Sequence, residues 1–305
     1  MSEESPDAVL LTAHGTVEHL HELPEFLLRI RHGRPAPAGL VAELERRYSA
    51  IGGSPLLRVT NEQAELLAAR LHVPVFVGMR LWRPELEDAV ARAVSAGVKR
   101  LCVLPLAPFS VHVYAKAAER ACSELGATLE LVIATPFGGS DGFVDAQVAA
   151  IRPHLQSESS EELILTAHSL PMSVVNAGDP YREQVEASAG AIAERLGRPY
   201  ILAYQSQGAD GGDWLGPDLR QALNDARDHG RERVVIAPIG FLSDHVETLY
   251  DLDIEAKAWA RELGLGFDRV PALNTAPALI SALDQAVRRA FRLSPGGEVC
   301  TIPAK

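Results

Sequence analysis

The chain repeats part of its own sequence at one constant spacing. Five residues of one segment recur 133 positions later in the 305-residue chain. They are Pro84, Gly97, Arg100, Pro105 and Ser110, which are followed by Pro217, Gly230, Arg233, Pro238 and Ser243. The beginnings of the two halves are also alike, since LLTAHG at 10–15 resembles LILTAHS at 163–169. Self-similarity at a fixed spacing predicts two halves built from the same structural units.

Short apolar runs alternate with amphipathic stretches in both halves. The apolar runs predict strands at 8–13, 73–79, 101–106, 129–134, 163–167, 201–204 and 234–239. The amphipathic stretches predict helices at 62–71, 84–96, 114–125, 184–196, 219–228 and 253–263. Runs that are apolar on both faces are typical of buried parallel strands, and strands that alternate with helices predict βαβ units. The fold class is therefore α/β, with a parallel sheet in each half.

The best candidate for a connection between the halves is the polar, serine-rich stretch at 156–162. It predicts an N-terminal domain at 1–158 and a C-terminal domain at 159–305. Parallel sheets bind ligands beyond the carboxyl ends of their strands. Two facing halves therefore predict an active-site cleft between them.

Composition excludes several classes of protein. Lys and Arg number 29 against 40 Asp and Glu, and this net charge of −11 disfavours nucleic acid as a partner. No apolar run is long enough to span a membrane, and the acidic N-terminus does not resemble a secretory signal. The three cysteines are scattered, which is typical of reduced thiols. We therefore expect a cytoplasmic protein.

Two histidines occupy equivalent places in the two halves. Both echoing strands end in Thr-Ala-His, so His14 and His168 lie just past the carboxyl ends of equivalent strands. A single histidine is more often a hydrogen-bonded structural residue than a catalytic one. Because His14 and His168 lie at equivalent strand ends, a structural role and a functional role are about equally good interpretations.

The segment PIGFLSDHVETLYDLDIE at 238–255 carries three regularly spaced carboxylates. A helix is expected to begin near Ser243 or Asp244, which places Glu247, Asp251 and Glu255 on one helical face. A solvated face is one interpretation; the other is a ladder that conducts protons or divalent cations, with its first carboxylate at raised pKa in the cleft. Opposite that first carboxylate, an imidazole would complete a pair suited to iron, zinc or cobalt in transit.

Basic residues gather in the N-terminal half. Arg29, Arg31, His32 and Arg34 lie close together, and Arg46-Arg47-Tyr48 follows. Local positive charge in an acidic protein suggests a ligand with carboxylates, which Arg binds in a bidentate manner, while a basic helix end is an equally good interpretation. The glycine turn at 51–55 matches neither GxGxxG nor a Walker motif, so no nucleotide site is expected.

With these residues in view, the chain resembles the ferrochelatases, which insert ferrous iron into a porphyrin. The most specific stretches are TAHSLP at 166–171 and the segment 238–255, supported by YSAIGGSP at 48–55 and QSQGADGGDWLGP at 205–217. The resemblance implies two Rossmann-like halves of chelatase type and a lyase activity in haem biosynthesis. It implies that His168 and Glu247 face each other across the porphyrin as the metal-binding and proton-accepting pair. Asp251 and Glu255 would relay protons or metal.

Within the family, RIRHGRP and APFSVHVYAKAA most resemble the Gram-positive-type, coproporphyrin-using branch. That resemblance implies that six residues contact the tetrapyrrole or its propionates: His14, Arg31, Arg47, Tyr48, Ser54 and Tyr114. The branch has an iron-ligating tyrosine where this chain has His14, and its glycine turn is one residue longer. Coproporphyrin III and protoporphyrin IX therefore both remain candidate substrates.

The resemblance implies ferrous iron as a substrate and no cofactor. Three dispersed cysteines cannot supply the four ligands of a [2Fe–2S] cluster, so none is expected. The expected partners are porphyrin and ferrous iron, with transient contacts to other haem-pathway enzymes. Three alternatives stay open: a cobalt or nickel chelatase for another tetrapyrrole, a non-catalytic haem carrier, and a two-lobed solute-binding protein, which the missing signal peptide disfavours.

Overall fold

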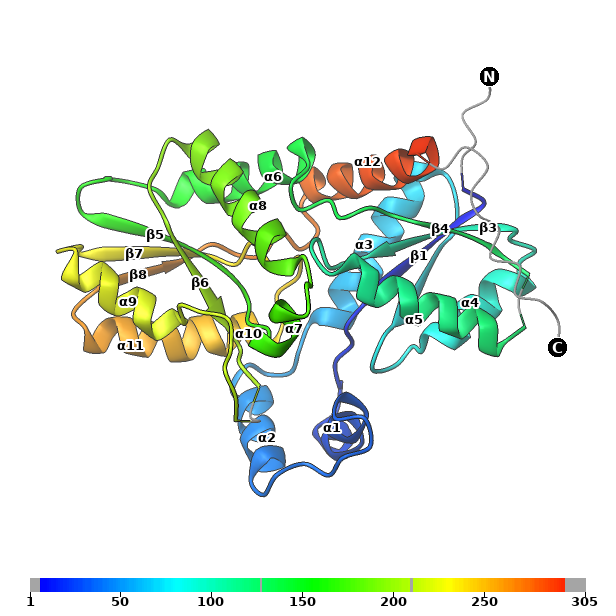
Figure 1. Cartoon of the computed structure of the whole chain (residues 1–305), viewed down its shortest axis with the longest axis horizontal. Coiled ribbons are helices and arrows are strands. Elements are labelled where there is room, and N and C mark those ends of the chain that lie inside the picture. The colour runs from blue at the N-terminus through cyan, green and yellow to red at the C-terminus, as the bar shows by residue number, and fades with distance from the viewer. Residues whose placement is uncertain (1–5, 127, 209–210, 294–305) are drawn as a thin grey trace. The chain divides into compact units, whose positions relative to one another are not determined.

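The structure is a computed structural model, which describes residues 6–126, 128–208 and 211–293. The chain divides into two compact units. Unit 1 comprises the described residues of Met1–Val41, Pro55–Phe137 and Thr275–Lys305, and unit 2 comprises those of Ala42–Ser54 and Gly138–Asn274. Each unit has its own sheet and its own helices, which can be followed in Figure 1.

Unit 1 contains a four-stranded parallel sheet in the order β2-β1-β3-β4. Its strands are β1 (Ala8–Ala13), β2 (Val75–Met79), β3 (Arg100–Pro105) and β4 (Glu130–Ile133). The central strand β1 pairs with β2 on one side and with β3 on the other. All of β1 is buried, as the unbroken apolar run AVLLTA predicts.

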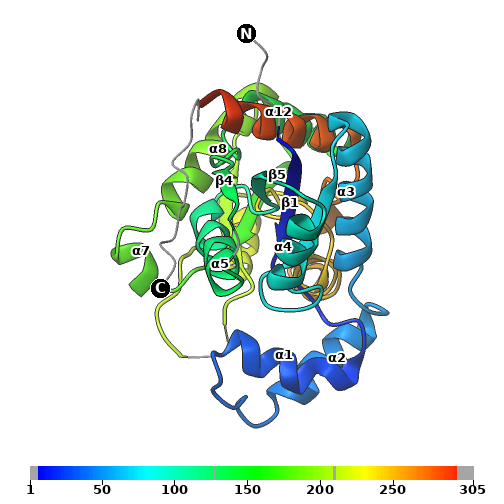
Figure 2. The same ribbon diagram turned by 90° about the vertical axis from the view of Figure 1, so that its right-hand side faces the viewer.

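Helices cover the sheet of unit 1. Helices α4 (Leu86–Ser95) and α5 (Val111–Glu124) pack on β1 and β3, while α3 (Leu56–Leu71) and α12 (Pro277–Leu293) pack on each other and on β2, β3 and β4 (Figure 2). A short 3-10 turn, η1 (Leu20–Glu22), and helix α1 (Leu23–Ile30) follow β1. Among the helices of the described chain, none has the length and apolar character needed to cross a membrane.

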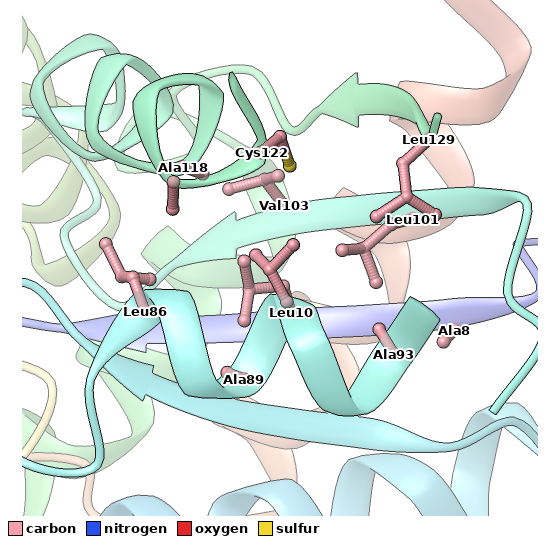
Figure 3. Packing of buried hydrophobic residues seen from close by; sticks show 12 residues of the cluster. Ala8, Leu10, Leu86, Ala89, Ala93, Leu101, Val103, Ala118, Cys122 and Leu129 are labelled. Atoms are coloured by element: carbon pink, nitrogen blue, oxygen red, sulfur yellow. The ribbon is translucent and has the colours of Figure 1, made fainter. Parts of the chain in front are cut away.

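Figure 3 shows the core between the sheet of unit 1 and its helices α4 and α5. Leu10 from β1 and Leu101 from β3 point toward the alanines that α4 and α5 place on their inner faces. Leu10, Ala89 and Ala118 have no exposed surface. Small side chains on the helices let them approach the sheet closely, so the larger strand residues fill the space between.

Unit 2 has the same topology, with strand order β6-β5-β7-β8, again all parallel. Its strands are β5 (Glu161–His168), β6 (Ile201–Gln205), β7 (Arg233–Ala237) and β8 (Gly266–Arg269). The order matches that of unit 1 when each of β1 to β4 is replaced by the strand four places later. The prediction of an α/β chain with two similar parallel sheets is confirmed.

Alternate residues of β5 and β7 face two layers of helices. Leu163 and Leu165 pack with α6 (Asp141–Ile151) and α8 (Tyr181–Leu196), whereas Ile164 packs with α9 (Leu219–Asp228), the π-helix η3 (Asp251–Ala256) and α11 (Lys257–Glu262). Successive strand residues point to opposite faces, so the sheet is covered on both. The remaining elements are α2 (Leu40–Ala50), η2 (Arg152–His154), α7 (Met172–Asn176) and α10 (Val246–Leu249).

The division into units differs from the expected boundary after residue 158. Helix α6 belongs to unit 2, because Val144 and Ile151 share a core with Leu163. Helix α12 returns to unit 1, where Asp284 pairs with Arg70 of α3 at 3.1 Å. The sequence of an amphipathic helix does not specify which of two sheets the helix covers. Tertiary packing decides that.

The stretch at 156–162 is not a surface linker along its whole length. Glu161 and Glu162 begin β5, and each is only 4% exposed. Glu161 binds Arg198 and Arg233, and Glu162 binds Arg231 at 3.2 Å.

Strand β8 was also absent from the expected elements, because its sequence GFDR is charged and half-exposed at the edge of the sheet.

Replacing Leu10 with alanine should lower the free energy of unfolding by about 2–5 kcal/mol, because it leaves a cavity in a fully buried cluster. Denaturant unfolding followed by circular dichroism measures this loss. Leu125→Ala is the control, since Leu125 caps α5 and is 45% exposed. The control should change stability by less than about 0.5 kcal/mol. Equal losses in the two variants would contradict the packing shown in Figure 3.

Candidate active site

Strand β5 delivers His168 to the carboxyl edge of the sheet in unit 2. Thr166 and Ala167 have no exposed surface, whereas the His168 side chain is 38% exposed. The hydroxyl of Tyr181 donates to the backbone oxygen of His168 at 2.8 Å. A buried strand and this hydrogen bond therefore hold the backbone of a side chain that is itself accessible.

The loop after β7 passes close to the end of β5. A Cβ placed on Gly240 would come within 2.8 Å of the Cα of Ala167, so only glycine allows this approach. The loop is then held by Asp244, which accepts hydrogen bonds from Arg269 at 2.7 Å and from Asn274 at 2.8 Å. Asp244 thus anchors the loop and does not begin a helix. Helix α10 begins at Val246, later than expected.

Three side chains meet where this loop and β5 come together, and we call them the His–Glu–His cluster: His168, Glu247 and His245. Oε2 of Glu247 lies 3.2 Å from Nδ1 of His168 and 3.5 Å from Nε2 of His245. Nδ1 of His245 lies 3.0 Å from the backbone oxygen of Ser243. Because that oxygen can only accept, Nδ1 of His245 carries a proton and Nε2 faces the carboxylate.

The cluster is an ion pair shared by two imidazoles. Burial opposes the charge on Glu247, but the charges and hydrogen bonds of His168 and His245 outweigh it and hold the pKa of Glu247 well below its usual range. Burial likewise opposes protonation of both histidines, and the Glu247 carboxylate outweighs it, so the pKa of each is raised. Glu247 therefore remains an anion, contrary to the expectation of a raised pKa at the first carboxylate.

His168 and Glu247 both belong to unit 2 and contact each other directly, with Nδ1 and Oε2 3.2 Å apart. A flat macrocycle could lie between them only if they separated. That they approach a porphyrin from opposite faces therefore stays a prediction.

The acidic segment that follows is not one regular helix. Helix α10 gives way to the π-helix η3, in which the N–H of Glu255 bonds the backbone oxygen of Tyr250, five residues back, at 3.0 Å. The expected helix at 253–263 is therefore divided between η3 and α11. π-Helices occur mostly as single-turn insertions within α-helices, and these insertions are frequent at functional sites.

Asp251 is the carboxylate whose pKa is raised. Its side chain is 10% exposed; burial, with the nearby charges of Glu247 and Glu255, raises its pKa to about 7 against the lowering effects of Ser206 and Arg47. The Ser206 hydroxyl donates to Oδ2 of Asp251. The second carboxylate of the predicted ladder, and not the first, therefore titrates near neutral pH.

Arg47 connects α2 to the acidic segment. Its guanidinium lies 2.7 Å from Glu43, 3.0 Å from Asp251 and 3.5 Å from Glu255, and 4.8 Å from the centre of the Tyr250 ring. The sequence shows no basic partner along the acidic stripe itself; α2 supplies it from 204 positions away. That Arg47 also binds propionates stays a prediction.

The other residues predicted to contact porphyrin are divided between the units. In unit 1, His14 is exposed just after β1, Arg31 caps α1 with its Nε 3.2 Å from the backbone oxygen of Pro35, and Tyr114 on α5 is 8% exposed. In unit 2, Tyr48 is buried on α2, and Ser54 is half-buried after it. Their contacts with a porphyrin remain predictions.

Unit 1 also contains a cavity of about 940 Å³. Its described lining includes Arg29, Arg80, Trp82, His112 and Lys116, and Arg29 pairs with Glu85 at 2.7 Å. The lining residues that the structure describes do not include His14, Arg31 or Tyr114. This cavity therefore differs from the predicted porphyrin site.

Sequence comparison identifies the family. The family model for ferrochelatase matches residues 6–291. The chain belongs to the ferrochelatase family. It is 34% identical over 305 residues to the ferrochelatase of Acidobacterium capsulatum, covering 92% of this chain and 93% of that protein. It is 36% identical over 298 residues to the coproporphyrin III ferrochelatase of Geobacillus kaustophilus, covering 92% and 94%.

The fold is likewise that of a chelatase. The solved structure of SirB from Bacillus subtilis with Fe3+ matches this ferrochelatase with a TM-score of 0.60 and covers 93% of this chain and 95% of that one. Sequence identity is 15%, so this likeness concerns the fold alone. It agrees with the two parallel sheets described above.

Ferrochelatases are lyases that insert iron, so the metal enters as a substrate. In the part of the chain that the structure describes, no three His, Cys, Asp or Glu side chains form a ready metal-binding set. In the His–Glu–His cluster, Nδ1 of His168 and Nε2 of His245 face the Glu247 carboxylate, so Nε2 of His168 is the nitrogen that does not face Glu247.

Sequence reasoning missed His245. Its backbone is extended, with φ −159° and ψ −169°, and extended residues two apart point to the same side. The sequence Asp-His-Val-Glu therefore could have placed His245 beside Glu247. Assigning the helix start to Ser243 or Asp244 concealed this, since residues two apart on a helix do not share a face.

Replacing Asp251 with asparagine should remove one contribution to the pH dependence of stability. The pKa of Asp251 is about 7 in the folded protein, against an ordinary 3.8, so the folded state binds more protons between these values. The free energy of unfolding of the wild type should therefore fall relative to the variant as pH rises from about 4 to about 7, by at most about 1.4 kcal/mol per pH unit, and then level off.

Denaturant unfolding of both proteins at several pH values measures this difference. His168 and His245 are present in both proteins, so their contributions largely cancel in the comparison. A difference that stays flat or grows over this pH range would contradict the raised pKa of Asp251.

Proposed function

We propose that this ferrochelatase inserts Fe2+ into coproporphyrin III in the cytoplasm, and that the His–Glu–His cluster removes pyrrole protons and transfers the metal. The observation that carries the proposal is the Glu247 carboxylate held between two imidazoles. Coproporphyrin is favoured over protoporphyrin by relatives at 34–36% identity that are named coproporphyrin III ferrochelatases.

Metal insertion requires that two pyrrole N–H protons leave the porphyrin. Glu247 engages Nδ1 of His168, which leaves Nε2 as the nitrogen that can face a ligand. A carboxylate on one imidazole nitrogen fixes the tautomer and makes the other nitrogen more basic. When His168 is neutral, its Nε2 accepts a pyrrole proton or binds the arriving iron.

Protons then leave along the acidic segment. Asp251 has a pKa of about 7, so it takes up and releases protons readily at neutral pH. Glu255 lies farther along η3 and its side chain is 28% exposed, compared with 10% for Asp251. Arg47 contacts both carboxylates and limits the repulsion between them. These residues form the relay between the cluster and solvent.

The porphyrin is held by its carboxylates. The guanidinium groups of Arg31 and Arg47 suit propionates because Arg binds carboxylates through paired N–H donors. Tyr48, Ser54 and Tyr114 complete the contacts, and His14 provides an imidazole for the iron of the product. Binding energy from the propionates, which do not react, is available to distort the ring toward the geometry that metal insertion needs.

No [2Fe–2S] cluster belongs to this proposal. Cys102 and Cys122 are buried on β3 and α5, and burial raises the pKa of the Cys102 thiol to about 12, which disfavours the thiolate that binds metals. Cys300 lies outside the described residues. The substrates, porphyrin and ferrous iron, are the principal partners, with transient contacts to other haem-pathway enzymes.

His168→Ala and Glu247→Ala should each reduce iron insertion by about 10²-fold or more, since each removes a group from the reacting cluster. Porphyrin binding should persist, because the propionate contacts are unchanged. Anaerobic assays of haem formation, together with fluorescence titration of bound porphyrin, separate the two effects. Insertion at the wild-type rate in either variant would refute the assignment of the cluster.

Wild-type protein given ferrous iron anaerobically should metallate coproporphyrin III with a higher kcat/KM than protoporphyrin IX. Absorption spectra follow both reactions. A preference for protoporphyrin IX would reverse the substrate assignment. Stoichiometric haem binding without turnover would identify a carrier, and turnover with cobalt or nickel but not iron would identify a different chelatase.

A further inference from the structure

A buried amide lies directly behind the His–Glu–His cluster. Gln205 is the last residue of β6, is 3% exposed, and lies opposite His168 in the register between β5 and β6. Its Nε2 donates to the backbone oxygen of Glu247 at 2.6 Å. The Gln205 side chain thus connects the paired strands β5 and β6, at the end where His168 lies, to the main chain of Glu247.

The next residue extends this connection to the relay. Nε2 of Gln205 also lies 3.4 Å from Oγ of Ser206, and Oγ donates to the carboxylate of Asp251. Ser206 adopts φ +61°, a left-handed conformation that side-chain-bearing residues rarely take. Through this conformation, the consecutive side chains of Gln205 and Ser206 reach Glu247 in α10 and Asp251 at the start of η3.

A glutamine at position 205 destabilises the folded state through one of its polar atoms, so packing alone does not explain its presence. Oε1 of Gln205 is buried without a hydrogen-bond partner among the residues that the structure describes. A buried polar atom left unpaired disfavours the folded state, and an apolar side chain of the same length would avoid that penalty. The Nε2 donor of the same amide, which binds the Glu247 backbone oxygen, therefore accounts for the glutamine at this position.

We propose that Gln205 and Ser206 are positioning residues that hold the Glu247 main chain and the Asp251 carboxylate at a fixed offset from His168, so that proton removal and relay are aligned. The inference rests on the proposed function of the cluster. Neither residue reacts with the porphyrin or the iron. They act through Glu247 and Asp251, whose placement decides the rate because reacting groups tolerate only small displacements.

The test is steady-state iron insertion by Gln205→Met, which keeps the side-chain length and removes the donor. We expect kcat to fall about 10–100-fold with KM for porphyrin changed less than about threefold. Gln205 would align reacting groups and would not contact the propionates. Gln205→Asn keeps the amide but is one methylene shorter, so it should fail similarly. Gln147→Met is the control, because Gln147 is also a buried glutamine of unit 2 but lies on α6.

Several outcomes would overturn the proposal. If Gln205→Met keeps kcat within twofold of wild type, or loses no more kcat than Gln147→Met does, Gln205 is not a positioning residue. The double variant with Ser206→Ala should lose less than the product of the two single losses, because coupled residues are not additive; independent losses would also overturn it. If Gln205→Met does not fold, the kcat of Ser206→Ala decides alone.

Absence of insertion by the wild type would instead refute the proposed function. The experiment therefore distinguishes the two failures: the wild type tests the reaction, and the variants test the alignment. Circular dichroism and melting temperatures of all variants show whether a loss of kcat reflects unfolding, which would lower activity without the expected separation of kcat from KM.

Discussion

The negative charge of Glu247 is the interaction on which the rest of the site depends. A half-buried carboxylate remains ionised here only because imidazoles approach it from two sides. The same charge raises the pKa of both histidines and contributes to the raised pKa of Asp251. The pKa values of His168, His245 and Asp251 therefore all depend on one carboxylate, and displacement of Glu247 would change all three together.

The scaffold holds that charge through several independent attachments. Gly240 allows the loop to cross the end of β5, Asp244 binds Arg269 and Asn274, and Gln205 holds the main chain of Glu247. Loops alone place side chains less accurately than strands do. Here the loop is fixed against β5 and β6 on one side and against Arg269 of β8 on the other.

Much of the fold was predictable because apolar runs are a local property of the sequence. Five of the seven expected strands begin within one residue of the observed start, and β1 agrees at both ends. Strand β8 and the assignment of α12 to unit 1 were not predictable, because both depend on contacts made far away in the chain. The same holds for the site: Glu247 and His168 were recognisable from their motifs, while Arg47 reaches Asp251 only through the packing of α2.

The internal repeat shows where the two units differ in their chemistry. The spacing of 133 residues places His112 and Tyr114 of unit 1 at the positions of His245 and Glu247 in unit 2. At the positions of Asp251 and Glu255, unit 1 has Ala118 and Cys122, which lie in its core. Two units with one topology thus have different chemistry, because the repeat retains the histidine but has tyrosine, alanine and cysteine where unit 2 has its three carboxylates.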